Sequence, residues 1–83
     1  MGARLVAGFA PPPPPADDLR SRFPALTARE ADVLALVARG RANPEIAAAL
    51  FLSPATVKSY VTTILAKLDA TTRAEAIALV LGA

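Results

Sequence analysis

The chain has 83 residues, enough for one small domain, and it contains neither cysteine nor histidine. Disulfides, zinc sites built from cysteine and histidine, and catalytic triads that depend on histidine are therefore excluded. Nine lysines and arginines outnumber seven aspartates and glutamates, and the resulting net charge of +2 suits a nucleic-acid partner without requiring one. The acids are scattered or stand at predicted helix starts, so we expect no enzyme, no metal and no cofactor.

Residues 1–22 are predicted to be a disordered segment with a proline-rich linker, and residues 23–83 to form the folded domain. The run Pro11–Pro15 favours a polyproline II spacer of roughly 15 Å; a ligand for a proline-binding groove is the alternative. The apolar stretch before it is too short for a signal peptide, and no stretch approaches the roughly 20 apolar residues of a membrane span. We assign no regular structure before about Leu19, and we expect a cytoplasmic protein without a membrane partner or a small-molecule cavity.

Two capping boxes mark helix starts in the domain. In the first, the Thr27 hydroxyl accepts a hydrogen bond from the third helical amide, and the Glu30 carboxylate accepts one from the cap amide. Gly40 supplies the left-handed stop of this helix. The second box, Thr72 with Glu75, opens the last helix. No apolar and polar alternation of period two occurs, so the predicted fold class is all-α, with four helices.

The two middle helices each begin with a proline. Asn43 is predicted to cap the second helix, with Pro44 at its first position, and this helix is only about two turns long. Ser53 and Pro54 open the third helix in the same way. About three residues, beginning at Phe51, connect the two. A short helix, a tight turn and a longer helix are typical of a helix-turn-helix, whose second helix lies in the major groove of DNA, although other small bundles share this spacing.

The third helix, about residues 54–68, has two faces of different chemistry. One face can be buried, because aliphatic residues recur on it at helical spacing: Val57, Val61, Ile64 and Leu68. The opposite face carries small side chains and short hydroxyls, Ala55, Ser59, Thr62 and Ala66, with Lys58 and Thr63 at its edges. No carboxylate occurs from Ser53 to Leu68. Such a helix can approach a polyanion closely without repelling it, which predicts a DNA-binding helix.

A series of spaced residues covers roughly residues 24–83: Leu26, Thr27, Arg29, Glu30, Val33, Leu34, Gly40, Asn43, Glu45, Ile46, Ala47, Leu50, Ser53, Thr56, Val57, Lys58, Ile64, Lys67, Leu68, Arg73 and Ala76. In order and register, this series resembles the LuxR/NarL-type DNA-binding domain of bacterial transcription regulators. The resemblance implies a four-helix domain that binds double-stranded DNA, commonly as a homodimer, with the third helix as the recognition helix.

The resemblance also implies roles for particular residues. It places Lys58, Ser59 and Thr62 against base edges, and it places Thr56, Thr63 and Asn43 near backbone phosphates. By charge alone, Arg41 and Arg73 are further candidates for the DNA backbone, and solvated surface arginines are the alternative. The family pairs subunits through the last helix, here at Ala76, Ile77 and Val80, for which packing onto the first helix is the alternative.

Two residues depart from the family pattern. Tyr60 stands where histidine is frequent, and its ring can pack while its hydroxyl reaches a phosphate. Asp69 stands where glycine often follows the Lys-Leu pair, at a turn that aspartate tolerates.

Two other functions fit the same helices. A module like region four of a sigma factor has a related helical corner and binds promoter DNA together with RNA polymerase, which is a further candidate partner in either case. A protein-interaction bundle could instead dimerise with a full-length regulator through the last helix and antagonise it, with weak DNA affinity of its own.

Overall fold

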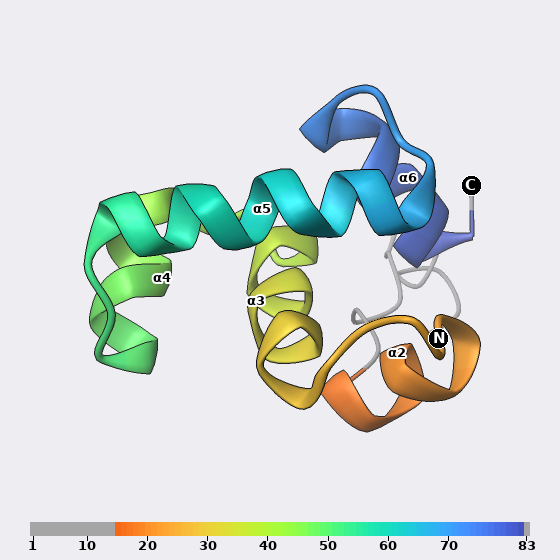
Figure 1. Cartoon of the computed structure of the whole chain (residues 1–83), viewed down its shortest axis with the longest axis horizontal. Helices are drawn as coiled ribbons and strands as arrows, with labels where there is room; N and C mark the ends of the chain where they lie inside the picture. The colour runs from red at the N-terminus through yellow and green to blue at the C-terminus, as the bar shows by residue number, and fades with distance from the viewer. Residues whose placement is uncertain (1–14, 83) are drawn as a thin grey trace, which may run out of the picture.

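A computed structural model describes residues 15–82, which contain five α-helices and no strand (Figure 1). Four of them are the predicted helices: α3 (Ala28–Ala38), α4 (Asn43–Leu50), α5 (Pro54–Leu68) and α6 (Arg73–Leu81). The predicted all-α class is therefore confirmed. Of residues 1–22, predicted to be a disordered segment with a proline-rich linker, residues 1–14 lie outside the described ones, and with them most of the proline run.

A further helix, α2 (Ala16–Arg22), precedes these four, and the prediction of no regular structure before about Leu19 is wrong. Acids occupy its first turn and arginines its last, which suits the helix dipole. Leu19 is fully buried in the core and is the only buried residue of α2. With one apolar anchor in two turns, α2 has no periodicity for sequence analysis to detect, and it depends on packing against α3.

The longest helix, α5, lies across the molecule, and the other helices are arranged along it (Figure 1). α4 packs on its N-terminal half and α6 on its C-terminal end, while α3 meets it near the middle. α3 contacts each of the other four described helices and is thus the centre of the bundle. α2 packs on α3, on the side away from α5.

A single hydrophobic core joins the helices. It receives at least one apolar residue from every described helix, and its largest fully buried side chains are Leu19, Val33, Leu34, Ile46, Val57, Ile64 and Val80. The predicted inner face of α5 is confirmed, because Val57 and Ile64 are buried and Val61 and Leu68 are partly buried against the core.

Local hydrogen bonds explain where three of the helices begin. Thr27 and Glu30 form the predicted capping box, with bonds of 3.1 and 2.8 Å. Ser53 caps α5, since its hydroxyl accepts from the Thr56 amide at 3.1 Å. Thr72 likewise accepts from the Glu75 amide, but the Glu75 carboxylate turns to the amide before the cap residue, so the second predicted box is only half formed.

Four described helices end on a residue in the left-handed conformation, and three of these ends, after α3, α4 and α5, share one hydrogen-bond pattern. Gly40 follows α3 with φ 82°, Phe51 follows α4 with φ 58°, and Asp69 follows α5 with φ 56°. After each one, the next amide donates to the carbonyl five residues earlier, at 3.2, 2.9 and 2.9 Å respectively. This is the Schellman arrangement, for which glycine is the usual residue. Asp69 therefore makes the turn that glycine would make.

Candidate nucleic-acid interface

α4 and α5 form a helix-turn-helix corner. Their axes are bent by 105° at a short break, within the range of about 90–120° that is usual for this motif. The break consists of Phe51 in the left-handed conformation, then Leu52 and the cap residue Ser53. Leu52 is partly buried against the core, whereas Phe51 is 95% exposed. The corner is therefore fixed by one helix stop and one helix cap.

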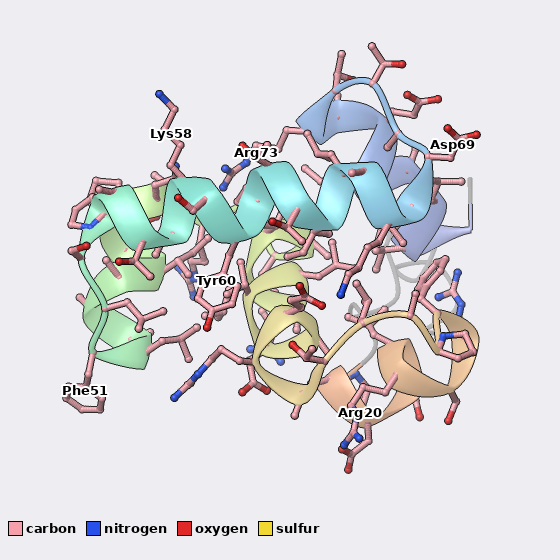
Figure 2. All side chains as sticks on the ribbon, viewed as in Figure 1. Arg20, Phe51, Lys58, Tyr60, Asp69 and Arg73 are labelled. Carbon is pink, nitrogen blue, oxygen red and sulfur yellow. The ribbon has the colours of Figure 1, made fainter. Side chains whose placement is uncertain are left out.

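The outer face of α5 is open. Its exposed residues include the whole predicted outer set and both edges: Ala55, Thr56, Lys58, Ser59, Thr62, Thr63 and Ala66. Figure 2 shows the Lys58 side chain extending away from the body of the molecule. No acid lies within α5, so this face carries no negative side chain of its own. The three residues expected to contact base edges are thus brought together on one accessible surface.

Two hydroxyls on this face are partly engaged within the protein. The Thr62 hydroxyl donates to the carbonyl of Lys58 at 3.1 Å, which uses its proton and leaves its lone pairs unused. The Thr56 hydroxyl lies 2.9 Å from that of Ser53. Thr62 is therefore arranged as a hydrogen-bond acceptor with a methyl group beside it, while Ser59 is exposed.

Tyr60 lies on a different side of α5 from Lys58. It is partly buried and packs against the core, and Figure 2 shows its ring over the α3–α4 side of the helix while Lys58 points the opposite way. The predicted packing role of the ring fits this position. The structure does not bring Tyr60 together with the base-contacting residues.

The start of α4 differs from the prediction that Asn43 caps it. Ala42 is the cap residue, and its amide donates to the Glu45 carboxylate at 2.8 Å. Asn43 is instead the first residue of the helix, and its Oδ1 accepts a hydrogen bond from Arg73 Nη1 at 2.6 Å. Asparagine was expected to cap because its short side chain often bonds to its own backbone, but here the guanidinium of another helix occupies it.

Arg73 is therefore not a freely solvated surface arginine. Besides Asn43, its Nη2 donates to the backbone carbonyl of Arg41 at 2.7 Å. These two bonds connect the first residue of α6 to the first residue of α4 and to the loop that precedes it, while the Arg41 side chain itself stays exposed. Arg41, Asn43 and Arg73 form one cluster at the start of α4.

Comparison with known proteins identifies the family of this domain. A family model described as "Bacterial regulatory proteins, luxR family" matches residues 24–80. The chain belongs to this family. The match begins after α2 and includes the whole helix-turn-helix corner.

Transcription regulators are among the luxR-family relatives. The uncharacterized transcriptional regulatory protein YhcZ of Bacillus subtilis is 48% identical over 60 residues, 72% of this chain and 28% of that protein. The probable transcriptional regulatory protein NarL of Mycobacterium tuberculosis is 46% identical over 78 residues, 89% of this chain and 33% of its own length. The chain thus spans about a third or less of these relatives. No solved structure is significantly similar to it.

The last helix of this luxR-family domain does not present the residues predicted for a dimer interface. Ala76 and Val80 are each 1% exposed and belong to the core, so their side chains are unavailable to a second subunit. Ile77 is partly buried against the same core. The exposed large apolar residues of α6 are Leu79 and Leu81, at 40% and 48%. The alternative of ordinary packing onto the bundle therefore holds for Ala76 and Val80.

An ion pair secures the C-terminal half of α5. Lys67 Nζ donates to Glu30 Oε1 at 2.7 Å and to the Ala25 carbonyl at 3.0 Å. This hydrogen bond from Lys67 lowers the pKa of the Glu30 carboxyl, helped by the Thr27 amide, while burial of the carboxyl opposes the shift. The pair ties the C-terminal half of α5 to α3, the helix that contains Glu30.

A second long-range contact of α6 joins its C-terminal end to α2. Arg22, at the end of α2, donates from Nη1 to the Val80 carbonyl at 2.7 Å and from Nη2 to the Leu79 carbonyl at 2.8 Å. A cation at the C-terminus of a helix is favourable because of the helix dipole. Since 57 and 58 residues separate the partners, no local sequence signal marks this contact.

Residues 15–82 show neither a cluster of metal-ligating side chains nor a single helix suited to a membrane. No group of three or more acids there could hold a metal ion. No single helix in that part is long and apolar enough to cross a membrane; only α4 and α5 taken together pass that test, as a pair bent at the helix-turn-helix corner.

Proposed function

We propose that the chain binds double-stranded DNA sequence-specifically in bacterial transcription regulation, with α5 in the major groove. The observation that carries this proposal is the exposed, acid-free outer face of α5 on a helix-turn-helix corner. Membership of the luxR family and the names of the relatives support the same role. A cytoplasmic location belongs to the proposal, because bacterial DNA lies in the cytoplasm, and RNA polymerase is the partner that such a regulator would address.

The outer face offers three kinds of base contact. Lys58 is a flexible cation that can donate to N7 and O6 of guanine. The exposed Ser59 hydroxyl can donate or accept. Thr62, whose proton is used at the Lys58 carbonyl, can accept from N4 of cytosine or N6 of adenine, and its methyl group can meet that of thymine. Because these side chains are short, water and DNA shape contribute to recognition as well.

The DNA backbone is contacted at the edges of this face. Thr56 and Thr63 are exposed on α5 and can hydrogen-bond to phosphate oxygens. Arg41, exposed in the loop before α4, can contribute a positive charge, and Asn43 beside it can contribute a neutral donor. Tyr60 is a weaker candidate than the sequence suggested, since its ring lies against the core.

We propose that the active form is a homodimer through α6. A single module of this size buries only about 600–1,000 Å² on DNA, and two modules would double the contacts and recognise half-sites about one helical turn apart. Because Ala76 and Val80 are buried, the exposed Leu79 and Leu81 replace them as the side chains offered to the partner, with Ile77 at the margin.

Selection of bound duplexes from a random DNA pool, at about 100 mM salt, tests the proposed function. We expect enrichment of an inverted repeat whose half-sites are about one helical turn apart. The same selection with Lys58→Ala should lose preference at specific positions. No enrichment with the unaltered chain would contradict the proposal and favour an interaction module that acts on a full-length regulator.

A further inference from the structure

The two hydrogen bonds donated by Arg73 determine the orientation of the side-chain amide of Asn43. The two terminal nitrogens of the guanidinium donate to two different acceptors, Asn43 Oδ1 at 2.6 Å and the Arg41 carbonyl at 2.7 Å. Such short distances are typical of hydrogen bonds from a charged donor. Arg73 and Asn43 are both half-buried, so the pair is held in place rather than mobile in solvent.

The chemistry of the pair fixes the orientation of the asparagine amide. A guanidinium has donors and no acceptor, so the amide atom that faces it must be the oxygen. The Nδ2 group of Asn43, with its two N–H donors, is therefore turned away from Arg73. Within residues 15–82 no protein acceptor pairs with it. The protein thus presents a fixed, unpaired amide donor at the start of α4.

This donor lies at the edge of the surface proposed for DNA. Figure 2 shows the Arg73 side chain beside α5, on the side to which Lys58 points, and Asn43 is within hydrogen-bond distance of it. The nearest carboxylate on α4, that of Glu45, is held by the Ala42 amide at 2.8 Å. Glu45 follows Asn43 by two residues, which places it about 200° around the helix, away from the asparagine amide.

We infer that Arg73 is a positioning residue, which turns the Asn43 amide outward to donate to a DNA phosphate, instead of binding a phosphate itself. The inference rests on the proposed function and assigns different roles to two residues of the cluster at the start of α4. Arg73 gives the orientation, and Asn43 makes the contact. The contact is neutral, so it contributes hydrogen-bond energy without releasing a counterion from the DNA.

The test measures binding to a 30-base-pair duplex of mixed sequence by fluorescence anisotropy, between about 50 and 200 mM salt. Mixed sequence is sufficient because phosphate contacts do not depend on base identity. The variants are Arg73→Lys, Asn43→Ala and the double variant. Arg20→Lys is the matched control, since Arg20 is exposed on α2 and lies far from Lys58 in Figure 2.

We expect Arg73→Lys to weaken binding by about 10-fold, because lysine keeps the charge but cannot form the two-pronged fork. Asn43→Ala should cause a similar loss, and the double variant should lose no more than the larger single one. The dependence on salt should stay unchanged, and Arg20→Lys should bind like the unaltered chain. The inference would be overturned if Arg73→Lys bound with unchanged affinity, or if the losses of the two single variants multiplied in the double variant. It would also be overturned if the slope of the salt dependence fell by about 0.9 in Asn43→Ala, Arg73→Lys or the double variant.

A second readout does not involve DNA. The side-chain amide signals of Asn43 in a nitrogen-15 correlation spectrum should move toward those of a solvated asparagine in Arg73→Lys, and signals that stay in place would overturn the inference. If Arg73→Lys does not fold, Asn43→Ala decides alone, since binding equal to that of the unaltered chain would refute the phosphate contact. Failure of the unaltered chain to bind any duplex would remove the proposed function and this inference together, whereas multiplied losses would remove the inference alone.

Discussion

The two lysines of α5 have opposite surroundings on one helix. Lys58 and Lys67 are nine residues apart, which puts them about 180° apart around the helix axis. Lys67 is bound to Glu30 and to the Ala25 carbonyl and joins α5 to the start of α3. Lys58 is exposed and extends away from the bundle (Figure 2). The same residue type therefore serves the fold at one position and is available to a partner at the other.

The difference shows that positive charge alone does not identify a DNA contact. A lysine or arginine is available to DNA only where no other part of the protein supplies an acceptor for its side chain. α3 places a buried carboxylate opposite Lys67. The first residue of α4 and the loop before it place an amide and a carbonyl opposite Arg73. No described helix packs over the outer face of α5, so a cation there stays available for phosphates or bases.

Removal of Lys67 is the strongest way to test the structural side of this comparison. Lys67→Ala should lower the free energy of unfolding by about 3 kcal/mol, because the buried Glu30 carboxylate loses its ion-pair partner. Urea unfolding measures this value. The DNA affinity of the folded fraction should stay unchanged.

The matched control combines Lys67→Ala with Glu30→Gln. It removes the unpaired charge and should recover part of the lost stability. A loss of DNA affinity without a loss of stability in Lys67→Ala would reverse the roles assigned to the two lysines.

The same ion pair makes stability depend on pH. Because the pKa of Glu30 in the folded chain is lowered from its ordinary value of 4.5, its contribution is fully present above that pH. The contribution is lost as the pH falls through the lowered value of the folded state. Urea midpoints between pH 7 and pH 3 should show a shallower acid loss for Glu30→Gln than for the unaltered chain.

The control for this pH dependence is Asp32→Asn. Asp32 and Arg29 form an exposed pair at 3.7 Å, which contributes little to stability. Its acid profile should follow that of the unaltered chain. An identical profile for Glu30→Gln would show that the Glu30 ion pair does not contribute in this way.

Removal of Lys58 tests the functional side. Lys58→Ala should weaken binding to a selected duplex by about 1–3 kcal/mol if the lysine contacts a base, with stability changed by less than about 0.5 kcal/mol. Anisotropy titration and urea unfolding together measure both quantities. Unchanged affinity would remove Lys58 from the interface.

The smallest expected effect concerns the turn that ends α5. Asp69 has φ 56°, which glycine adopts at lower cost, so Asp69→Gly should stabilise the chain by about 0.5–1 kcal/mol. DNA affinity should not change, because Asp69 lies at the far end of α5 from Lys58 (Figure 2). Destabilisation by Asp69→Gly would mean that the Asp69 side chain stabilises the fold in some way beyond forming this turn.

Local signals were sufficient to predict four of the described helices. The capping box at Thr27, the cap at Ser53 and the stop at Gly40 each depend on residues within one helical turn, so the sequence displays them directly. The two faces of α5 follow from helical periodicity, and the structure confirms both the buried and the exposed side.

Long-range contacts explain what the sequence could not show. Arg22 and Arg73 find acceptors 30 to 58 residues away, and nothing near either residue identifies those partners. Asn43 has the composition of a cap, but a distant guanidinium occupies its side chain. The small and branched residues of α6 are equally suited to a dimer and to a core, and only the packing of α3 on α6 shows that Ala76 and Val80 belong to the core.

Titration of the nitrogen-15-labelled chain with a selected duplex most directly tests whether the outer face of α5 binds DNA. The amide signals of Lys58, Ser59 and Thr62 should shift strongly, while those around Lys67 on the opposite face should change little. Shifts concentrated around Lys67 or on α2, with the outer face of α5 unaffected, would contradict the proposed interface.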